Sequence, residues 1–215
     1  MEILEIKDLE ILAKKRVPKM FFDYVNSGSW TETTYNENVS DFQKIKLRQR
    51  VAIDMSNRTL ETKMINQPVS MPVAIAPTGL TGMQRADGEI LAAQAAEEFG
   101  IPYTLSTMSV CSIEAVAKKT TKPFWFQLYV MKDKKFMERL IDRAKEANCS
   151  ALVLTLDLQL LGQRHKDLRN GLSTPPKLIP KHIYQVLTRP MWCLRMLTTK
   201  NHFFGNIVGH VEGIK

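Results

Sequence analysis

The sequence predicts an α/β protein built on part of a parallel (β/α)8 TIM barrel, preceded by a helical lead-in. Three apolar runs support this prediction: VAIAPTG at 73–79, FWFQLYV at 124–130 and ALVLTLD at 151–157. Each run has the length of a buried strand and ends on polar residues. Inward-facing positions at the carboxyl ends of parallel barrel strands line the mouth where active sites form. The three runs therefore also predict a functional site.

The first 70 residues predict a helical and irregular lead-in. We expect helices at 6–16 and 18–26, separated at Pro18, whose ring cannot continue a helix. A third helix is expected in TETTYNENVSDF, at 31–42. The stretches 45–53 and 59–68 predict an irregular or hairpin region, with a break at residues 66–68.

Residues 71–157 alternate between strand and helix patterns. We expect strands at 73–77, 102–106, 124–130 and 151–157, whose starts lie 29, 22 and 27 residues apart. Helices are expected near 88–99, in SIEAVAKK at 112–119, and at 133–148, where Phe136, Leu140, Ile141 and Ala144 form one apolar stripe. This spacing suits the repeat of a barrel and predicts an incomplete barrel of about four βα units. An open doubly wound sheet is the alternative, although no GxGxxG follows the first strand.

The composition is that of a globular protein, with 44% hydrophobic and 24% charged residues. No apolar stretch reaches the roughly 18 residues needed to span a bilayer, and the N-terminus lacks the basic flank and apolar core of a signal peptide. These features predict a cytoplasmic chain. The three cysteines show no zinc-ligand spacing, so we predict no metal site.

Nearly all of the net positive charge lies in residues 158–215, which we expect to form a basic loop and helix. The formal net charge is +8, and this segment holds nine Lys or Arg against two acidic residues, a local +7. Apolar residues such as Met191, Trp192 and Phe203 are interleaved with the basic ones, a mixture that suits an anionic membrane surface. The favoured alternative is a solvated basic face whose loop and helix pack on the second half of the barrel, which these residues do not include. Nucleic acid is disfavoured, because no zinc-finger, RNP-like or leucine-zipper pattern is present.

The alternation of side chains along a strand groups the polar residues at the strand ends. Gln127 and Tyr129 project to one side of their strand, and Thr155 and Asp157 project together from the next. For Thr155 and Asp157 the structural alternative is a polar layer inside the barrel, since buried carboxylates must be paired.

Several ordered segments resemble the FMN-dependent α-hydroxy acid dehydrogenase and oxidase family, close to its bacterial L-lactate dehydrogenase branch. They are FDYVNSGSW, APTGLTGM, LSTMSVCSIEAVA, WFQLYV and LTLDLQLLGQRHKD. The resemblance covers nearly the whole chain but only the N-terminal half of such an enzyme. It implies one domain over 1–215, divided into the lead-in (1–70), barrel strands one to four (71–157) and the basic loop and helix (158–215).

The resemblance implies that the cofactor is FMN. Pro77, Thr78 and Gly79 would set the backbone and small side chains against the flavin ring, where only small residues allow a close approach. The residues expected to hydrogen-bond the polar edge of the ring are Ser106, Gln127 and Thr155. For Ser106 and Thr78 the alternative is that they cap the helices that follow.

The resemblance also implies the substrate and catalytic residues. Tyr24 and Tyr129 would contact the carboxylate and hydroxyl of the substrate, and Arg164 would reach the carboxylate with its fork of donors. Asp157 would orient the catalytic histidine and stabilise its imidazolium. In the family the histidine, a neighbouring arginine, a lysine near flavin N1 and the phosphate-binding loops come from the second half of the barrel, so none is assigned here. The chain's own histidines follow the fourth strand, at 165, 182, 202 and 210.

The function implied for the complete enzyme is oxidation of an L-2-hydroxy acid such as lactate to the 2-oxo acid, with electrons passing to a respiratory acceptor or oxygen. Residues 1–215 alone are expected to be inactive. Alternatives are a truncated non-catalytic fragment, a partner-binding remnant, or a different FMN-dependent barrel enzyme. The resemblance further implies a homotetramer, and peripheral contact with the cytoplasmic face of the inner membrane is an alternative location.

Overall fold

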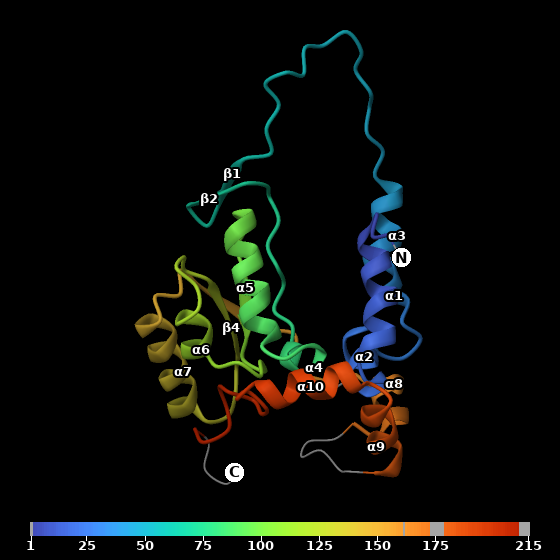
Figure 1. The fold of residues 1–215 in the computed structure, drawn as a ribbon. Coiled ribbons are helices and arrows are strands. Elements are labelled where there is room, and N and C mark those ends of the chain that lie inside the picture. The colour runs from blue at the N-terminus through green and yellow to red at the C-terminus, as the bar shows by residue number, and fades with distance from the viewer. Residues whose placement is uncertain (1, 161, 173–178, 211–215) are drawn as a thin grey trace.

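A computed structural model describes residues 2–160, 162–172 and 179–210. It consists of an α/β body around a parallel sheet and a helical body that contains the N-terminal helices (Figure 1). Helix α10 (Pro190–Thr198) runs between the two bodies, and an extended arm from residue 45 to residue 61 connects them on the other side. Residues from both ends of the chain therefore contribute to the helical body.

The lead-in is helical, as predicted. Its helices are α1 (Ile6–Arg16), α2 (Lys19–Val25), α3 (Thr33–Ser40) and the 3-10 helix η1 (Asp41–Lys44). Pro18 separates α1 from α2, because proline supplies no N–H for the α1 ladder but suits the start of the next helix. The arm of residues 45–61 has no regular structure and is exposed to solvent.

A hairpin follows the arm. Strands β1 (Thr62–Met64) and β2 (Gln67–Val69) pair in antiparallel register. Ile65 and Asn66 form the turn with φ of 47° and 61°, the left-handed conformation that a two-residue hairpin loop requires. The break predicted at residues 66–68 was thus placed too late, since Gln67 and Pro68 already belong to β2.

The main sheet is parallel and open. Its strands are β3 (Thr104–Ser106), β4 (Trp125–Tyr129) and β5 (Ala151–Thr155), in the order β3-β4-β5. The strand predicted at 73–77 forms only a single parallel bridge, between Ile75 and Tyr103. The two backbone bonds of this bridge run from Ile75 N to the Pro102 oxygen and from Thr104 N to the Ile75 oxygen. The α/β class is confirmed, whereas the predicted number of four βα units is not.

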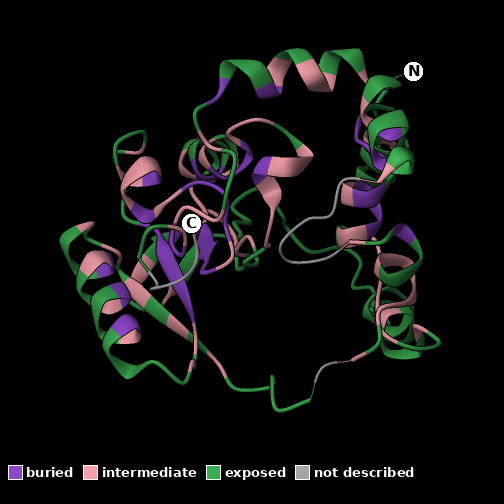
Figure 2. Ribbon diagram, turned by 90° about the horizontal axis from the view of Figure 1, so that it is seen from below, coloured by how far each residue is buried: buried purple, intermediate pink, exposed green. Residues whose placement is uncertain are grey.

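Helices cover one face of the sheet. The predicted helices appear as α5 (Gly88–Phe99), α6 (Ile113–Ala117) and α7 (Lys134–Glu146), and a short helix α4 (Thr81–Gln84) precedes them. In α7 the predicted stripe is buried at Phe136, Leu140 and Ala144, and Asp133 caps the helix by accepting from Phe136 N at 3.0 Å. Buried residues gather in this body, between the strands and the inner faces of the helices (Figure 2).

The helix layer stops before β5. Phe126 and Leu128 of β4 are 0% and 3% exposed, but their register partners Leu152 and Leu154 are 46% and 49% exposed. Within the described residues β5 pairs with β4 alone, so its other edge and its helix-side face are open.

The described part of 158–215 forms more helix than the predicted loop with one helix. It contains α8 (His165–Asn170), α9 (Pro180–Leu187) and α10, and prolines occupy the first turns of α9 and α10, where their missing N–H costs nothing. These helices pack on the N-terminal part of the chain: Gln185 Oε1 accepts from Met20 N at 2.9 Å, and the Trp192 ring stacks on Phe21 with centroids 5.6 Å apart. Across the described ranges, none of the helices is both long enough and apolar enough to span a bilayer.

Candidate functional site

Three polar side chains form a hydrogen-bonded row across the carboxyl ends of β3, β4 and β5. Ser106 Oγ donates to Gln127 Oε1 at 3.3 Å, and Gln127 Nε2 donates to Thr155 Oγ1 at 2.6 Å. Ser106 and Gln127 are buried, with 2% and 1% exposed. The row lies on the sheet face opposite the helices, because these positions alternate with the helix-covered Phe126 and Leu128. The strand-end row therefore presents neutral donors and acceptors at one place.

Neither Ser106 nor Thr78 caps a helix. Ser106 Oγ accepts from Met108 N at 3.1 Å, and the N-cap of the following helix α6 is Ser112. Thr78 Oγ1 donates to the Ala76 oxygen at 3.4 Å, and the N-cap of α4 is Leu80. The capping alternative for these two residues is wrong.

Tyr129 and Asp157 continue the same face of the sheet. Tyr129 pairs in register with Thr155, and two residues beyond Thr155 lies Asp157. Burial raises the pKa of the Tyr129 phenol, and the negative charge of Asp157 raises this pKa further. Asp157 is exposed and forms no hydrogen bond or ion pair with another residue of the described ranges. The phenol is protonated at neutral pH and lies within the electrostatic reach of a free carboxylate.

Tyr24 and Arg164 lie in direct contact, although 140 residues separate them in sequence. The guanidinium carbon of Arg164 lies 4.8 Å from the centroid of the Tyr24 ring, a cation–π geometry. Arg164 Nη2 also donates to the Tyr24 backbone oxygen and, at 2.8 Å, to Ser27 Oγ. Burial raises the pKa of Tyr24, the charge of Arg164 opposes this rise, and Tyr129 adds to it. The contacts of Arg164 therefore hold the segment before α8 against α2.

The turn after the strand predicted at 73–77 lies against Tyr24. A Cβ added at Gly79 would lie 2.7 Å from Tyr24 Oη and 3.4 Å from Met108 Cβ, so a larger residue would displace the phenol. Leu80 N donates to the Met108 oxygen at 3.1 Å and ties this turn to the loop after β3. Pro77 and Thr78 are exposed beside Gly79.

Two acidic residues that hold the site together were not predicted. Asp167 Oδ2 lies 3.0 Å from Arg164 Nε, an ion pair without the alignment of a hydrogen bond, and Asp167 Oδ1 is buried with no partner among the described residues. Burial raises the pKa of Asp167, the Arg164 charge opposes this, and Asp23 adds to it. The i, i+3 spacing of Arg164 and Asp167 was the available sequence signal.

The second residue is Glu89, which is fully buried at the start of α5. Its Oε1 accepts from Gly82 N and from Val110 N, both at 2.9 Å. Glu89 thereby joins the loop after the strand predicted at 73–77 to the loop after β3. No local pattern indicated this role, since the two amides precede and follow Glu89 by seven and 21 residues and lie outside α5.

The chain's histidines lie away from the strand-end row. His182 Nε2 is 2.7 Å from the Asn170 oxygen, between α8 and α9. The His165 ring meets Trp30 edge-on at 6.1 Å, and His202 is exposed. Burial lowers the pKa of His210, which lies near Arg143.

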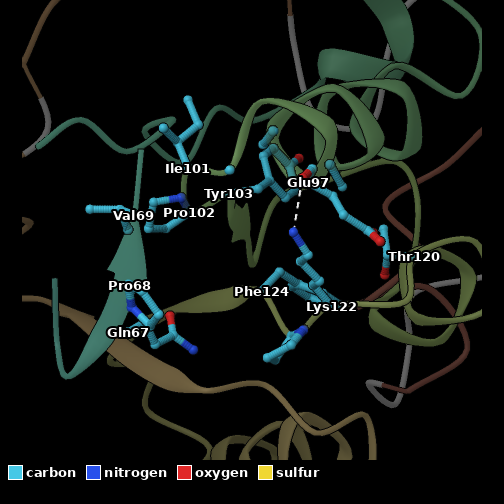
Figure 3. Close-up of a pocket in the computed structure, with 14 residues that line it drawn as sticks. Gln67, Pro68, Val69, Glu97, Ile101, Pro102, Tyr103, Thr120, Lys122 and Phe124 are labelled. Carbon is cyan, nitrogen blue, oxygen red and sulfur yellow. Dashed lines mark hydrogen bonds between the residues drawn. The ribbon is translucent and has the colours of Figure 1, made fainter. Parts of the chain in front are cut away.

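A hollow of about 320 Å³ lies at the opposite end of the strands (Figure 3). It is lined in part by Val69, Pro102 and Phe124, and Lys122 Nζ donates to the Glu97 oxygen at 3.4 Å beside it. The hollow contains none of the residues predicted for the site. Because parallel α/β proteins bind ligands at the carboxyl ends of their strands, we place the candidate site at the strand-end row.

Comparison with known proteins gives consistent matches over almost the whole chain. Residues 13–211 match the FMN-dependent dehydrogenase family. The chain is 46% identical over 201 residues to an L-lactate dehydrogenase of Acinetobacter baumannii, a match that covers 93% of this chain and 52% of that relative. It is 44% identical to an L-lactate dehydrogenase of Acinetobacter baylyi, and this match covers 100% of the present chain and 57% of that relative.

Solved structures give the same picture. A crystal structure described as that of monotopic membrane protein (S)-mandelate dehydrogenase superposes with a TM-score of 0.89 and 32% identity, over 97% of this chain and 56% of the other. A mandelate oxidase superposes with a TM-score of 0.74 and 32% identity, over 82% of this chain and 50% of the oxidase. The chain thus spans about half the length of the relatives it matches.

Proposed function

The chain belongs to the FMN-dependent dehydrogenase family, and we propose that the whole protein oxidises an L-2-hydroxy acid such as lactate to the 2-oxo acid with reduction of FMN. The observation that carries the proposal is the strand-end row, with Tyr129 and Asp157 continuing it on the same face of the sheet. Structural neighbours of the chain include (β/α)8 barrel enzymes that act on mandelate. For the architecture, we propose half of a barrel with four βα units. The strand of the first unit is reduced to the bridge at Ile75.

The residues of the strand-end row fit a flavin. Ser106, Gln127 and Thr155 offer neutral hydrogen-bonding groups, which suits the polar edge of an isoalloxazine ring. Gly79 has no Cβ, and one added there would lie 2.7 Å from Tyr24 Oη, so only glycine leaves the phenol and the backbone this close to a ring; Pro77 and Thr78 adjoin it. When bound, FMN supplies the two-electron acceptor, which the chain's own side chains cannot provide.

Tyr24, Tyr129 and Arg164 are proposed to bind the substrate. Both phenols are protonated at neutral pH, because burial raises the pKa of each, so they can donate to a carboxylate or hydroxyl. Arg164 adds a planar pair of donors, which favours a carboxylate substrate. Asp157, which is exposed and free of other partners, is proposed to hold and stabilise the cationic form of a histidine base.

One observation favours a second candidate, a non-catalytic fragment or partner-binding remnant. Within the described residues β5 pairs with β4 alone, and its other edge is open. Such an edge is a template for pairing with another chain. A different FMN-dependent barrel acting on phosphorylated substrates is less consistent with Arg164 lying against Tyr24.

Peripheral membrane contact is also proposed, through α9 and α10. Tyr184, Leu187 and Leu197 are 70%, 71% and 82% exposed, and the surrounding segment carries most of the net positive charge. The similarity to a monotopic membrane protein is consistent with this contact. A cytoplasmic location on the inner membrane and a homotetrameric assembly remain predictions, to be checked by cell fractionation and by sedimentation velocity.

A graft tests the catalytic proposal. Residues 13–211 would replace the matching segment of the Acinetobacter baumannii L-lactate dehydrogenase, which supplies the remainder of the enzyme. We expect a yellow protein whose flavin absorbance is bleached by L-lactate under anaerobic conditions. Tyr129→Phe in the graft should slow bleaching by about tenfold or more, because a donor to the reacting substrate is lost.

The control for the graft is Tyr184→Phe, an exposed tyrosine on α9 outside the site. A graft that folds and retains FMN, yet is bleached by no L-2-hydroxy acid, would contradict the proposed function. Residues 1–215 by themselves are predicted to retain little FMN, as measured by flavin absorbance after gel filtration.

A further inference from the structure

A second hollow, of about 210 Å³, is lined by three arginines and by no acidic residue. Arg16 is the last residue of α1, Arg85 follows α4 as its C-cap, and Arg195 lies in the last turn of α10. These elements meet where α10 passes between α4 and the end of α1 (Figure 1). Three segments distant in sequence thus bring like charges to one place.

Arg16 and Arg85 are exposed and Arg195 is partly buried, and within the described residues none of the three guanidinium groups has a side-chain partner. Across the described ranges, no side-chain hydrogen bond or ion pair involves Arg16, Arg85 or Arg195, whereas Arg143 binds Glu114 at 2.6 Å. Each of the three stands at a helix C-terminus, where the carbonyl dipole favours a cation. A helix end carries only about half a negative charge, so net positive charge remains in the hollow.

The walls of the hollow are fixed by hydrogen bonds that leave the arginines free. Trp192 Nε1 donates to the Met83 oxygen at 2.8 Å, and Gln84 Nε2 donates to the Phe21 oxygen at 2.7 Å. The Trp192 ring also stacks on Phe21. The hollow is therefore built from a fixed neutral wall and three unpaired cations. A concave surface of one sign concentrates the opposite charge, so an anion bound here would relieve the repulsion among the arginines.

We propose that this hollow binds a phosphate group, and that the headgroup of an anionic phospholipid is its source. Guanidinium forks match phosphate oxygens in pairs, and the volume suits a single headgroup better than an extended polyanion. Met191, which lines the hollow, is 59% exposed, and Leu194 and Leu197 of the same helix are 57% and 82% exposed. Apolar side chains beside an anion site are what a lipid requires, because its acyl chains adjoin its phosphate.

Two probes test the proposal on the whole chain without FMN or hydroxy acid, so its outcome is independent of the catalytic proposal. Glycerol 3-phosphate, a water-soluble phosphate ester, would be titrated while the indole N–H signal of Trp192 is followed by NMR. Co-sedimentation with phosphatidylcholine vesicles containing phosphatidylglycerol would report lipid binding at fixed salt. The test variant is Arg85→Gln with Arg195→Gln. The control, Lys15→Gln with Lys200→Gln, removes the same charge from exposed positions that do not line the hollow.

We expect the arginine variant to weaken both kinds of binding by about tenfold or more, and the lysine variant to weaken them by less than about twofold. Binding of glycerol 3-phosphate without binding of vesicles would support the phosphate site but assign it to a soluble ester. The proposal is overturned if the lysine variant loses as much affinity as the arginine variant, because the effect would then be one of net charge. It is equally overturned if neither probe binds the unaltered chain.

Discussion

Replacement of Glu89 should show how strongly one buried carboxylate organises the loops of the candidate site. Glu89 is 0% exposed, and its Oε1 is the acceptor for Gly82 N and Val110 N, each at 2.9 Å. Neither amide has another acceptor among the described residues. Glu89→Leu would leave both N–H groups buried and unpaired and would also remove the 3.4 Å bond from Cys111 N to Oε2. At about 1–3 kcal/mol for each of the two shorter bonds, the free energy of unfolding should fall by at least about 2–6 kcal/mol. Glu89→Gln keeps one oxygen for both amides and should cost about 1 kcal/mol.

Urea denaturation followed by circular dichroism measures these differences, and amide hydrogen exchange locates them. In the Leu variant, the amides of Gly82 and Val110 should lose protection while those of β4 keep theirs. The control is Glu98→Leu, an exposed position on the same helix, which should change stability by less than about 0.5 kcal/mol. A Leu variant as stable as the Gln variant, with both amides still protected, would refute the reasoning.

Two further predictions concern other parts of the fold. The Arg143 guanidinium, 2.6 Å from the Glu114 carboxylate, lowers the pKa of Glu114 from 4.5 to about 2. The stabilisation that the Glu114–Arg143 ion pair gives the folded chain is therefore present above pH 4.5 and is lost as the pH falls toward 2. In urea titrations, the stability difference between the unaltered chain and Glu114→Gln should shrink between pH 7 and pH 3. A constant difference would contradict this prediction. On the open face of β5, Leu152→Glu with Leu154→Glu should reduce concentration-dependent light scattering, whereas Leu197→Glu, on α10, should reduce it less. Equal scattering by both variants would show that the open face of β5 does not drive association.

The strand-end row illustrates what local pattern predicts well. The period of two places Gln127 and Tyr129 on one face, and parallel register then sets Tyr129 beside Thr155. The helices of the α/β body were predicted for the same kind of reason, since the apolar stripe of α7 repeats with the helical period.

Contacts between distant segments could not be predicted in this way. Arg164 was expected near a substrate carboxylate, but its position against Tyr24, Ser27 and Asp167 depends on how α8 packs on α2. The helices of the basic segment were also underestimated, because they are short and are stabilised by packing on the lead-in. The weak first strand has a similar origin: its side chains predict a strand, but only the pairing at Ile75 decides how much of it forms.

The amino-acid sequence by itself determined the α/β class, the alternation of helix and strand, the family and the identity of the polar groups at the strand ends. These features follow from periods of two and 3.6 residues and from ordered motifs, which are local properties of the chain. Only the tertiary structure decided that Glu89 joins two loops, that Arg164 lies against Tyr24, and that three arginines without side-chain partners among the described residues share one hollow. Such arrangements depend on contacts across as many as 140 residues, whose formation is decided by packing and leaves no periodic signal in the chain.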